Sequence, residues 1–373
     1  MLEIKIVNQK IIDMKAIYTL GLISAILLLV SKSTLKAQTL ESFGIGEWES
    51  YVSEYMNPFA QAMSVSMSGG WANTAKVHST LGFDITFSGT YSIVPTENYT
   101  FSTGDLNMPQ YTFSESSTPS VSAGSDINPP NMTRIFGGQS LEFPAFKGLG
   151  VNFGGMMTLQ GAVGLPKGIE LMFRYVPDFS GTVNKVLPSG IAMEPTGMWG
   201  VGVKHDIKQW IPVVKSVPFL NMSVLFAYSK FHTGFSGSTL RIDPERLNVV
   251  DNINNDALWN DQKFDMEMSS FVGSFLVSVN IPVFQPYIGI GFNSGHFKGG
   301  FCGNYPIVDA VADPNDPFEA NTYEQDPLKV DTKNTDFNFQ AGARLKMGFF
   351  VIYYQYTRQG YNMHTGGIGI TLR

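Results

Sequence analysis

A strict alternation of apolar and polar side chains runs through residues 80–93. Apolar side chains occupy the odd positions from Leu81 to Ile93, apart from Gly89, and mostly Thr and Ser occupy the even positions. Since successive side chains of a β-strand point to opposite faces, the segment predicts a strand with one apolar and one hydrated face. The same alternation recurs over residues 335–347. Strands of this kind must cover their apolar face with a second sheet or with lipid.

The start of the chain has the pattern of a secretory leader. An apolar run over residues 17–30 follows Lys15, and Leu35-Lys36-Ala37 is typical of a cleavage site. The run is shorter than the roughly 20 residues that a membrane-spanning helix needs, which favours cleavage over a retained helix. We therefore predict a leader over residues 1–37 with translation starting at Met14.

The composition favours a membrane barrel over a soluble sandwich. Charged residues make up 15% of the chain, against about 25% in ordinary soluble domains. The polar positions of the strands carry mainly small neutral groups, which suits the lumen of an outer-membrane barrel. A net charge of −6 excludes nucleic acid as a partner. The expected partners are outer-membrane lipid and the barrel assembly machinery.

Ten segments have strand patterns, and an even total of about 10 to 14 is expected. We therefore predict an all-β fold, a transmembrane antiparallel β-barrel over residues 79–373 with a short N-terminal helical plug over residues 38–78. Residues 94–150 are predicted to be a long loop with short strands, and the long loops at 232–263 and 298–334 are predicted to face outward. The strand segments are 80–93, 157–165, 169–176, 197–206, 219–231, 264–281, 285–297, 335–347, 349–358 and 364–372.

One helix is predicted, over residues 41–68, with a break or kink at Asn57-Pro58. Its aromatic residues follow helical spacing, so they form a stripe that must be buried. The expected location is the periplasmic mouth or the lumen, where the helix would act as a hatch; a membrane-surface or partner-binding helix is the alternative. The candidate ligand and hatch residues are Trp48, Tyr51, Tyr55, Asn57, Pro58 and Phe59.

A second set of candidates lies on the polar face of the strands. Arg or Lys on the lipid face near the bilayer midplane costs about 2–4 kcal/mol, so charged residues on strands are expected to face the lumen. They would either hold the plug to the wall, which we favour, or select a substrate. These lumen candidates are Asp84, Glu170, Arg174, Gln340, Arg344 and Lys346.

No pattern predicts catalysis, a metal or a cofactor. The five histidines are scattered, and each is expected to be exposed or at the rim. His205-Asp206 is an adjacent acid–imidazole pair, but no hydrolase motif accompanies it. The acidic residues between Asp309 and Asp331 are interpreted as a solvated loop, since their spacing matches no calcium loop. Cys302 is the single cysteine, which excludes an internal disulfide.

Two parts of the chain resemble known families. Asn57-Pro58-Phe59-Ala60 and the strand at 80–93 resemble the start of the FadL-like long-chain fatty-acid transporters, although the glycine-rich bend follows Asn-Pro here. Residues 152–177 and 200–207 are similar to uncharacterised Gram-negative outer-membrane barrels. The resemblance implies a monomeric barrel of up to about 14 strands whose N-terminal hatch blocks the passage of hydrophobic molecules.

These observations predict an outer-membrane channel for passive uptake of hydrophobic or amphipathic small molecules. The alternative is a structural or surface-interaction barrel with a filled lumen and partner-binding loops.

Overall fold

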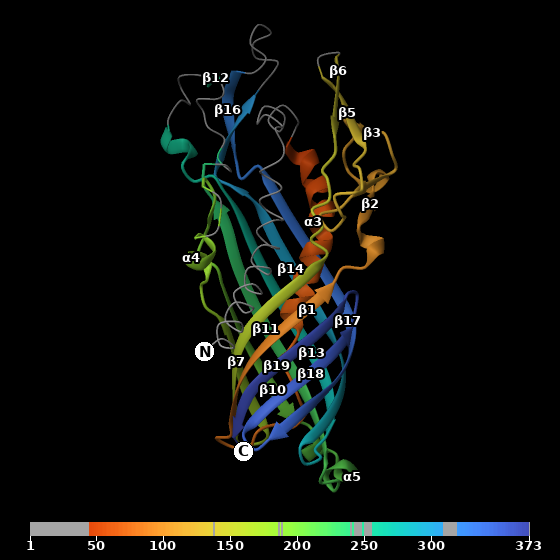
Figure 1. The fold of residues 1–373 in the computed structure, drawn as a ribbon, viewed down its shortest axis with the longest axis vertical. Helices are drawn as coiled ribbons and strands as arrows, with labels where there is room; N and C mark the ends of the chain where they lie inside the picture. Colours follow the sequence, from red (N-terminus) through yellow and green to blue (C-terminus); the bar gives the residue numbers. More distant parts are fainter. Residues whose placement is uncertain are drawn as a thin grey trace, which may run out of the picture.

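The computed structural model describes residues 45–136, 139–185, 187, 189–238, 241, 248–249, 256–308 and 319–372. The predicted leader, the first residues of the predicted hatch and the acidic segment 309–318 lie outside these residues. A closed antiparallel barrel dominates the molecule (Figure 1).

The barrel has ten strands, which is within the predicted range of 10 to 14. Each strand pairs with the next barrel strand along the chain, and β1 pairs with β19 from Phe83↔Leu372 to Ile93↔Asn362, which closes the barrel. The strands are β1 (Phe83–Ile93), β7 (Phe153–Leu165), β8 (Ile169–Val176), β10 (Gly197–Asp206), β11 (Leu220–Ser236), β13 (Lys263–Val279), β14 (Phe284–Cys302), β17 (Leu328–Met347), β18 (Phe350–Arg358) and β19 (Asn362–Leu372).

The two ends of the barrel differ in their connections. At one end, short turns join the strands, such as the turn at Lys167 and Gly168, which both adopt positive φ. The exception at this end is residues 207–219, which contain η3 (Lys208–Trp210) and α5 (Pro212–Lys215). Long connections gather at the other end (Figure 1). Because outer-membrane barrels have short periplasmic turns and long external loops, we assign the turn end to the periplasm and the loop end to the exterior.

Short elements occupy the loop end. Residues 94–136 and 139–152, here called the cap, connect β1 to β7; they contain the predicted short strands together with two short 3-10 helices. The cap elements are η1 (Thr96–Asn98), β2 (Thr100–Ser102), η2 (Thr103–Asp105), β3 (Tyr111–Phe113), β4 (Ser117–Pro119), β5 (Asn131–Phe136) and β6 (Gln139–Pro144). The others are α4 (Ser180–Val183), β9 (Ala192–Met193), β12 (Asn248–Val249), η5 (Asp256–Trp259), β15 (Asn304–Val308) and β16 (Glu319–Gln325).

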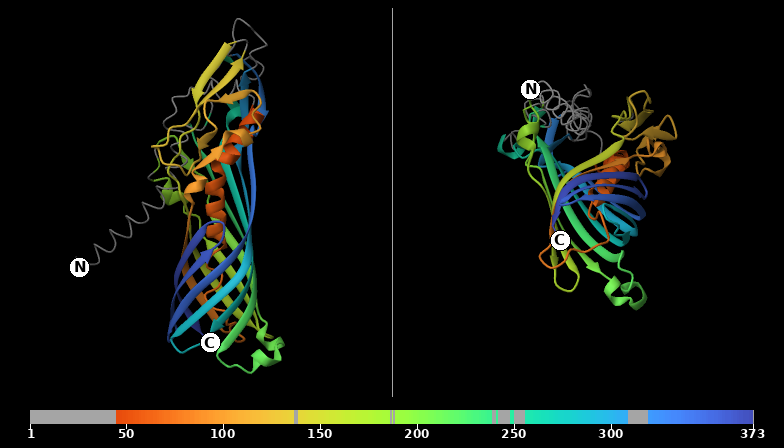
Figure 2. Two further views of the ribbon diagram at one scale, coloured as in Figure 1. Left: turned by 90° about the vertical axis from the view of Figure 1, so that its right-hand side faces the viewer. Right: turned by 60° about the horizontal axis from the view of Figure 1, so that its bottom comes forward.

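The predicted helix is α3 (Ile45–Ser68), and it lies inside the external half of the barrel (Figure 2). The prediction of the periplasmic mouth was therefore wrong, and that of the lumen was right. The helix also continues through Pro58, so the predicted break is absent. An interior proline costs about 3 kcal/mol, but one buried cluster holds aromatic residues from both sides of it, including Tyr55 and Phe59. That shared packing keeps the two halves in one helix. None of the helices in the described ranges has the length and apolarity to cross a membrane.

An apolar belt surrounds the barrel on its outer face. Every barrel strand contributes exposed large hydrophobic side chains, for example Phe87 on β1, Ile288 on β14 and Ile368 on β19. The 11 residues of β1 rise about 28 Å along the barrel axis at the usual strand spacing and tilt, close to the roughly 25 Å band of outer-membrane barrels. Lipid therefore covers the apolar face, and the protein is an outer-membrane barrel.

The wall is taller on one side than the sequence predicted. Strands β11, β13, β14 and β17 extend beyond the belt, and their outer faces there carry ion pairs such as Lys230–Glu267 at 2.8 Å. Much of the segment 298–334, predicted to be a loop, is therefore strand. Charged outer positions concealed its alternation, because the inner positions Leu328 and Val330 are apolar there.

The belt makes a first testable prediction. Ile288→Arg places a charge in the middle of the belt and should lower the free energy of unfolding by about 2–4 kcal/mol. His296→Arg is the matched control, because His296 lies on the same face of β14 above the belt and faces Asp331 at 2.8 Å. Urea unfolding in detergent or lipid vesicles measures both. Equal stability of the two variants would contradict the position of the belt.

Candidate functional site

The aromatic stripe of α3 is anchored to the cap. Trp48 Nε1 donates a hydrogen bond to the Tyr111 hydroxyl at 3.1 Å. The Tyr51 hydroxyl accepts one from the Phe146 backbone N–H at 3.0 Å, and Tyr55 donates to the Lys147 carbonyl at 2.7 Å. These contacts make the external part of α3 and the cap one packed unit.

Burial also affects the ionisation of the two tyrosine hydroxyls in this unit, which lies outside the belt. Desolvation raises the pKa of Tyr51 to about 12, although hydrogen bonds with Thr118 and Phe146 oppose the rise. Desolvation likewise raises the pKa of Tyr55. Both hydroxyls therefore remain neutral over the physiological range, and the interface between helix and cap carries no charge from them.

The structure brings four of the six hatch candidates together. Trp48, Tyr51, Tyr55 and Phe59 all belong to one buried apolar cluster. Pro58 is buried as well, whereas Asn57 is only half-buried and its side-chain oxygen has no hydrogen-bond partner in the described ranges. Asn57 and Pro58 are therefore not part of this cluster.

This cluster fills the external half of the lumen. The strands line it with inward aromatic and thioether side chains where the polar positions of a barrel usually lie, and α3 contributes Met56, Met63 and Met67. Sequence reasoning missed this apolar lining, because it assigned the inner face to small polar residues. The wall residues in the cluster are Met156, Met198, Phe231, Phe235, Phe264, Met266, Met268, Phe297, Leu328 and Val330.

Beyond α3, residues 69–79 continue through the periplasmic half of the lumen to reach β1. Trp71 packs against Gly200 and Gly202, where a Cβ atom would lie 3.1 Å from its ring. The guanidinium of Arg174 lies over the same ring, 4.0 Å from its centroid. Two glycines and one arginine of the wall thus form a fitted site for Trp71.

Arg174 is fully buried and binds neutral oxygen atoms. Its Nη2 donates to Gln160 Oε1 at 3.0 Å, and its Nη1 donates to the Met67 carbonyl at 3.2 Å. Since the Met67 carbonyl lies at the end of α3, where backbone acceptors are unpaired, Arg174 also satisfies the helix terminus. This lumen candidate therefore fixes the junction between α3 and residues 69–79.

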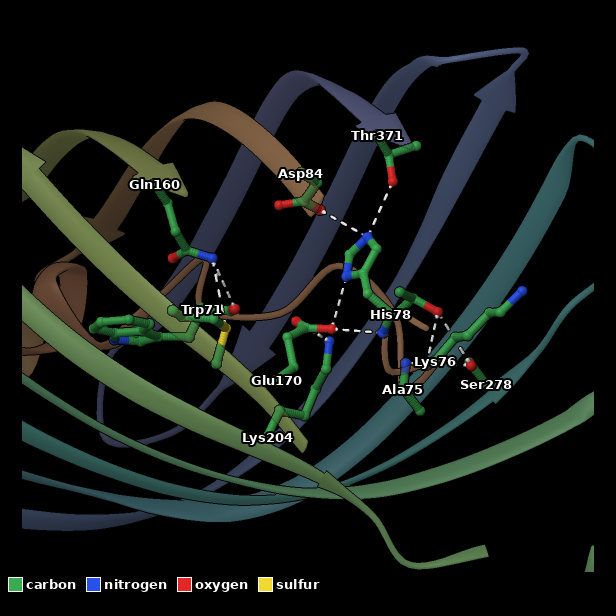
Figure 3. A network of polar contacts seen from close by, with 12 residues as sticks. Trp71, Ala75, Lys76, His78, Asp84, Gln160, Glu170, Lys204, Ser278 and Thr371 are labelled. Carbon is green, nitrogen blue, oxygen red and sulfur yellow. Dashed lines mark hydrogen bonds and ion pairs between the residues drawn. The ribbon is translucent and has the colours of Figure 1, made fainter. Parts of the chain in front are cut away.

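Glu170 is the centre of a second group of contacts (Figure 3). Its Oε2 accepts hydrogen bonds from the backbone N–H of His78 at 2.9 Å and lies 2.7 Å from His78 Nδ1. Its Oε1 lies 2.8 Å from Lys204 Nζ, and both side chains are almost fully buried. On the other side of the imidazole, His78 Nε2 lies 3.1 Å from the Thr371 hydroxyl and 3.9 Å from Asp84. The carboxylate therefore connects the end of the plug to β8 and β10, and the imidazole connects it to β19.

The remaining lumen candidates also point inward. Gln340 and Arg344 are buried on the inner face of β17, and Asp84 is buried beside His78. Lys346 lies on the same face but at the periplasmic mouth, where it is half-exposed. The polar parity of the strands therefore placed these residues on the correct face.

Sequence reasoning missed His78, Lys204 and Trp71. His78 was predicted to be exposed or at the rim, and this was wrong, since it is 7% exposed. Lys204 has a sequence signal, because it follows Gly200 and Gly202 on the inner positions of β10. His78 has none, because it lies in an irregular segment whose partners are far away in the sequence.

The histidines do not form a metal centre in the described ranges, where no group of three or more His, Cys, Asp or Glu side chains converges. His205 lies at the periplasmic end of β10, and its Nε2 accepts a hydrogen bond from Trp210 at 3.0 Å. Asp206 accepts from the Lys208 backbone at 2.9 Å. This pair therefore shapes the turn that follows β10.

Comparison with known proteins identifies the family. Residues 14–372 match the model of a family of unknown function, DUF6588. The chain belongs to this family. No curated protein matches the DUF6588 chain.

Several solved structures are similar to this DUF6588 protein in fold. The COG4313 outer membrane channel from Pseudomonas putida F1 has a TM-score of 0.34 at 6% identity, covering 81% of this chain and 99% of that one. The translocator domain of the autotransporter NalP from Neisseria meningitidis has a TM-score of 0.30 at 10% identity, covering 87% and 98%. The attachment invasion locus protein Ail of Yersinia pestis has a TM-score of 0.25 at 9% identity, covering 78% and 97%.

Proposed function

We propose that the protein is a passive outer-membrane channel for hydrophobic or amphipathic small molecules of the fatty-acid type. In this proposal the barrel is a monomer surrounded by outer-membrane lipid, and α3 with residues 69–79 is its hatch. The observation that carries the proposal is the apolar lining of the external lumen. A water-filled porin has a polar interior, whereas this lining offers an apolar molecule the environment that α3 now occupies.

The chemistry of the lining supports exchange between helix and ligand. Methionine is unbranched and polarisable, so it adapts to partners of different shape. Met266 and Met268 on β13 contribute to the cluster together with Met56 and Met63 on α3. A lining of this kind can repack around an alkyl chain when the helix moves.

Uptake measurements test the proposal. Cells that lack the protein should take up a radiolabelled long-chain alcohol and a long-chain carboxylate more slowly than cells that produce it, because both must cross the outer membrane through an apolar path. Mass spectrometry of the protein purified in a neutral detergent should find a bound amphiphile. Equal uptake in both strains together with an empty purified protein would contradict the proposal.

A second candidate function, a surface-interaction barrel, is favoured by a separate observation. The cap and the tall wall extend past the belt, and the cap is bound to α3, so the filled lumen also supports an external platform. The hairpin of β5 and β6 projects at its tip (Figure 1). Deleting residues 131–144 separates the two functions: loss of cell adhesion with unchanged uptake favours the platform, and loss of uptake with unchanged adhesion favours the channel.

A further inference from the structure

Three cationic side chains gather at the periplasmic end of the lumen. Arg344 and Lys346 share the inner face of β17, and Lys76 lies on the plug segment opposite them. The ammonium group of Lys346 interacts electrostatically with both of the other cations. Figure 3 shows Lys76 projecting away from Glu170, so the carboxylate that neutralises Lys204 is not directed at this group.

Lys76 and Lys346 line a cavity that opens at the periplasmic mouth. Its volume is about 360 Å³, and Lys76, Lys346 and the amides of Gln285 and Asn280 line it. No carboxylate belongs to this lining. Gln285 is paired directly with Arg344 in the β14–β17 register, and its side chain donates a hydrogen bond to Asn280. The lining therefore combines positive charge with amide groups and contains no anion.

Arg344 adds an independent observation. It is 4% exposed, and its Nε has no hydrogen-bond partner in the described ranges. Asp84 and Glu170 attract it at longer range, but neither forms an ion pair with it among the residues described. A buried guanidinium with a free donor is costly unless an acceptor binds it. Arg344 does not line the cavity, but it is paired in register with Gln285, which does, so its positive charge lies behind the lining.

We propose that the periplasmic cavity binds an oxyanion of the phosphate type through Lys76 and Lys346, with Arg344 adding positive charge behind the lining. Lysine ammonium groups act as point charges for such an anion. Two sources share this chemistry: free inorganic phosphate in the periplasm, and the phosphate of a phospholipid in the inner leaflet, which meets the barrel at this level. The proposal does not depend on transport through the hatch.

Phosphorus NMR of the full-length protein in a maltoside detergent tests this site. In one arm inorganic phosphate is titrated, and in the other short-chain phosphatidylglycerol is added to the micelles. Lys346→Gln and Lys76→Gln should each weaken binding about tenfold, the change expected when one charge-assisted hydrogen bond of about 1.4 kcal/mol is lost. Lys215→Gln is the matched control, because Lys215 lies at the same end of the barrel on α5 but outside the cavity.

Each outcome decides the matter. Binding of inorganic phosphate that both cavity variants weaken supports a site for a free anion, and the same result with the lipid alone supports a headgroup site. The proposal is overturned if the wild-type protein binds neither compound, or if the cavity variants bind as tightly as Lys215→Gln. The heat-dependent shift in gel mobility, measured on every variant, confirms that the barrel is folded.

Discussion

Connecting α3 to the wall with a disulfide at positions 66 and 92 is expected to abolish uptake of the long-chain alcohol and carboxylate. Ser66 lies in the last turn of α3, Ser92 lies on β1, and their hydroxyl oxygens are 3.0 Å apart in a fully buried contact. A hydroxyl contact this short is compatible with the Cβ separation of about 3.8 Å that a disulfide requires. If a substrate must displace α3 from the apolar lumen, the crosslink removes the open state entirely.

The crosslinked protein contains its own control. The variant Ser66→Cys, Ser92→Cys is made with Cys302→Ser, so that the native cysteine on β14 cannot compete for a partner. Uptake is then measured in the oxidised state and again after reduction, with Ser66→Cys alone as a second control. A moving hatch is supported if reduction restores uptake in the double variant and leaves uptake by the single variant unchanged. Equal uptake before and after reduction would show that α3 stays in place and would favour the surface platform.

The barrel itself was largely predictable from the sequence, because each strand lies between two different environments. Lipid on one side and the lumen on the other impose opposite polarity on alternate residues, so parity identifies a strand and the face of each side chain. β10 illustrates this, since its predicted range of 197–206 is the range that the structure has. Glu170 and Arg174 were placed in the lumen by the same rule.

Parity could not determine what each inward side chain meets. The rule gives the face of a residue but neither its height along the barrel nor its partner across the lumen, which depends on the path of the plug. Glu170 illustrates the limit: its inward position followed from β8, whereas its contact with His78 depends on an irregular segment 92 residues earlier. The apolar lining was missed for a related reason. Phe297 and Leu328 lie where the strands leave the membrane, and there the outer face is polar while the inner face is apolar.

The contact centre at Glu170 provides the second large expected effect. Glu170→Gln keeps the shape and a hydrogen-bond acceptor for His78 but leaves the buried ammonium of Lys204 without a counter-charge. Breaking a buried ion pair by removing one partner typically costs about 3–5 kcal/mol. We expect a loss of that size in the free energy of unfolding, measured by urea denaturation in micelles. Because the same carboxylate holds residue 78, the variant should also release the periplasmic part of the plug.

A double variant distinguishes the charge effect from simple damage to packing. Lys204→Met removes the ammonium but retains an apolar chain of similar length, so adding it to Glu170→Gln removes the unpaired charge. Since a buried ion pair can often be replaced by neutral groups at little cost, most of the lost stability should return. Accessibility of the plug is followed in parallel by proteolysis at Lys76, which is exposed beside the contact centre. If the double variant is no more stable than Glu170→Gln, the buried charge is not what holds the plug, and the interactions of Trp71 and Arg174 remain as its principal attachment.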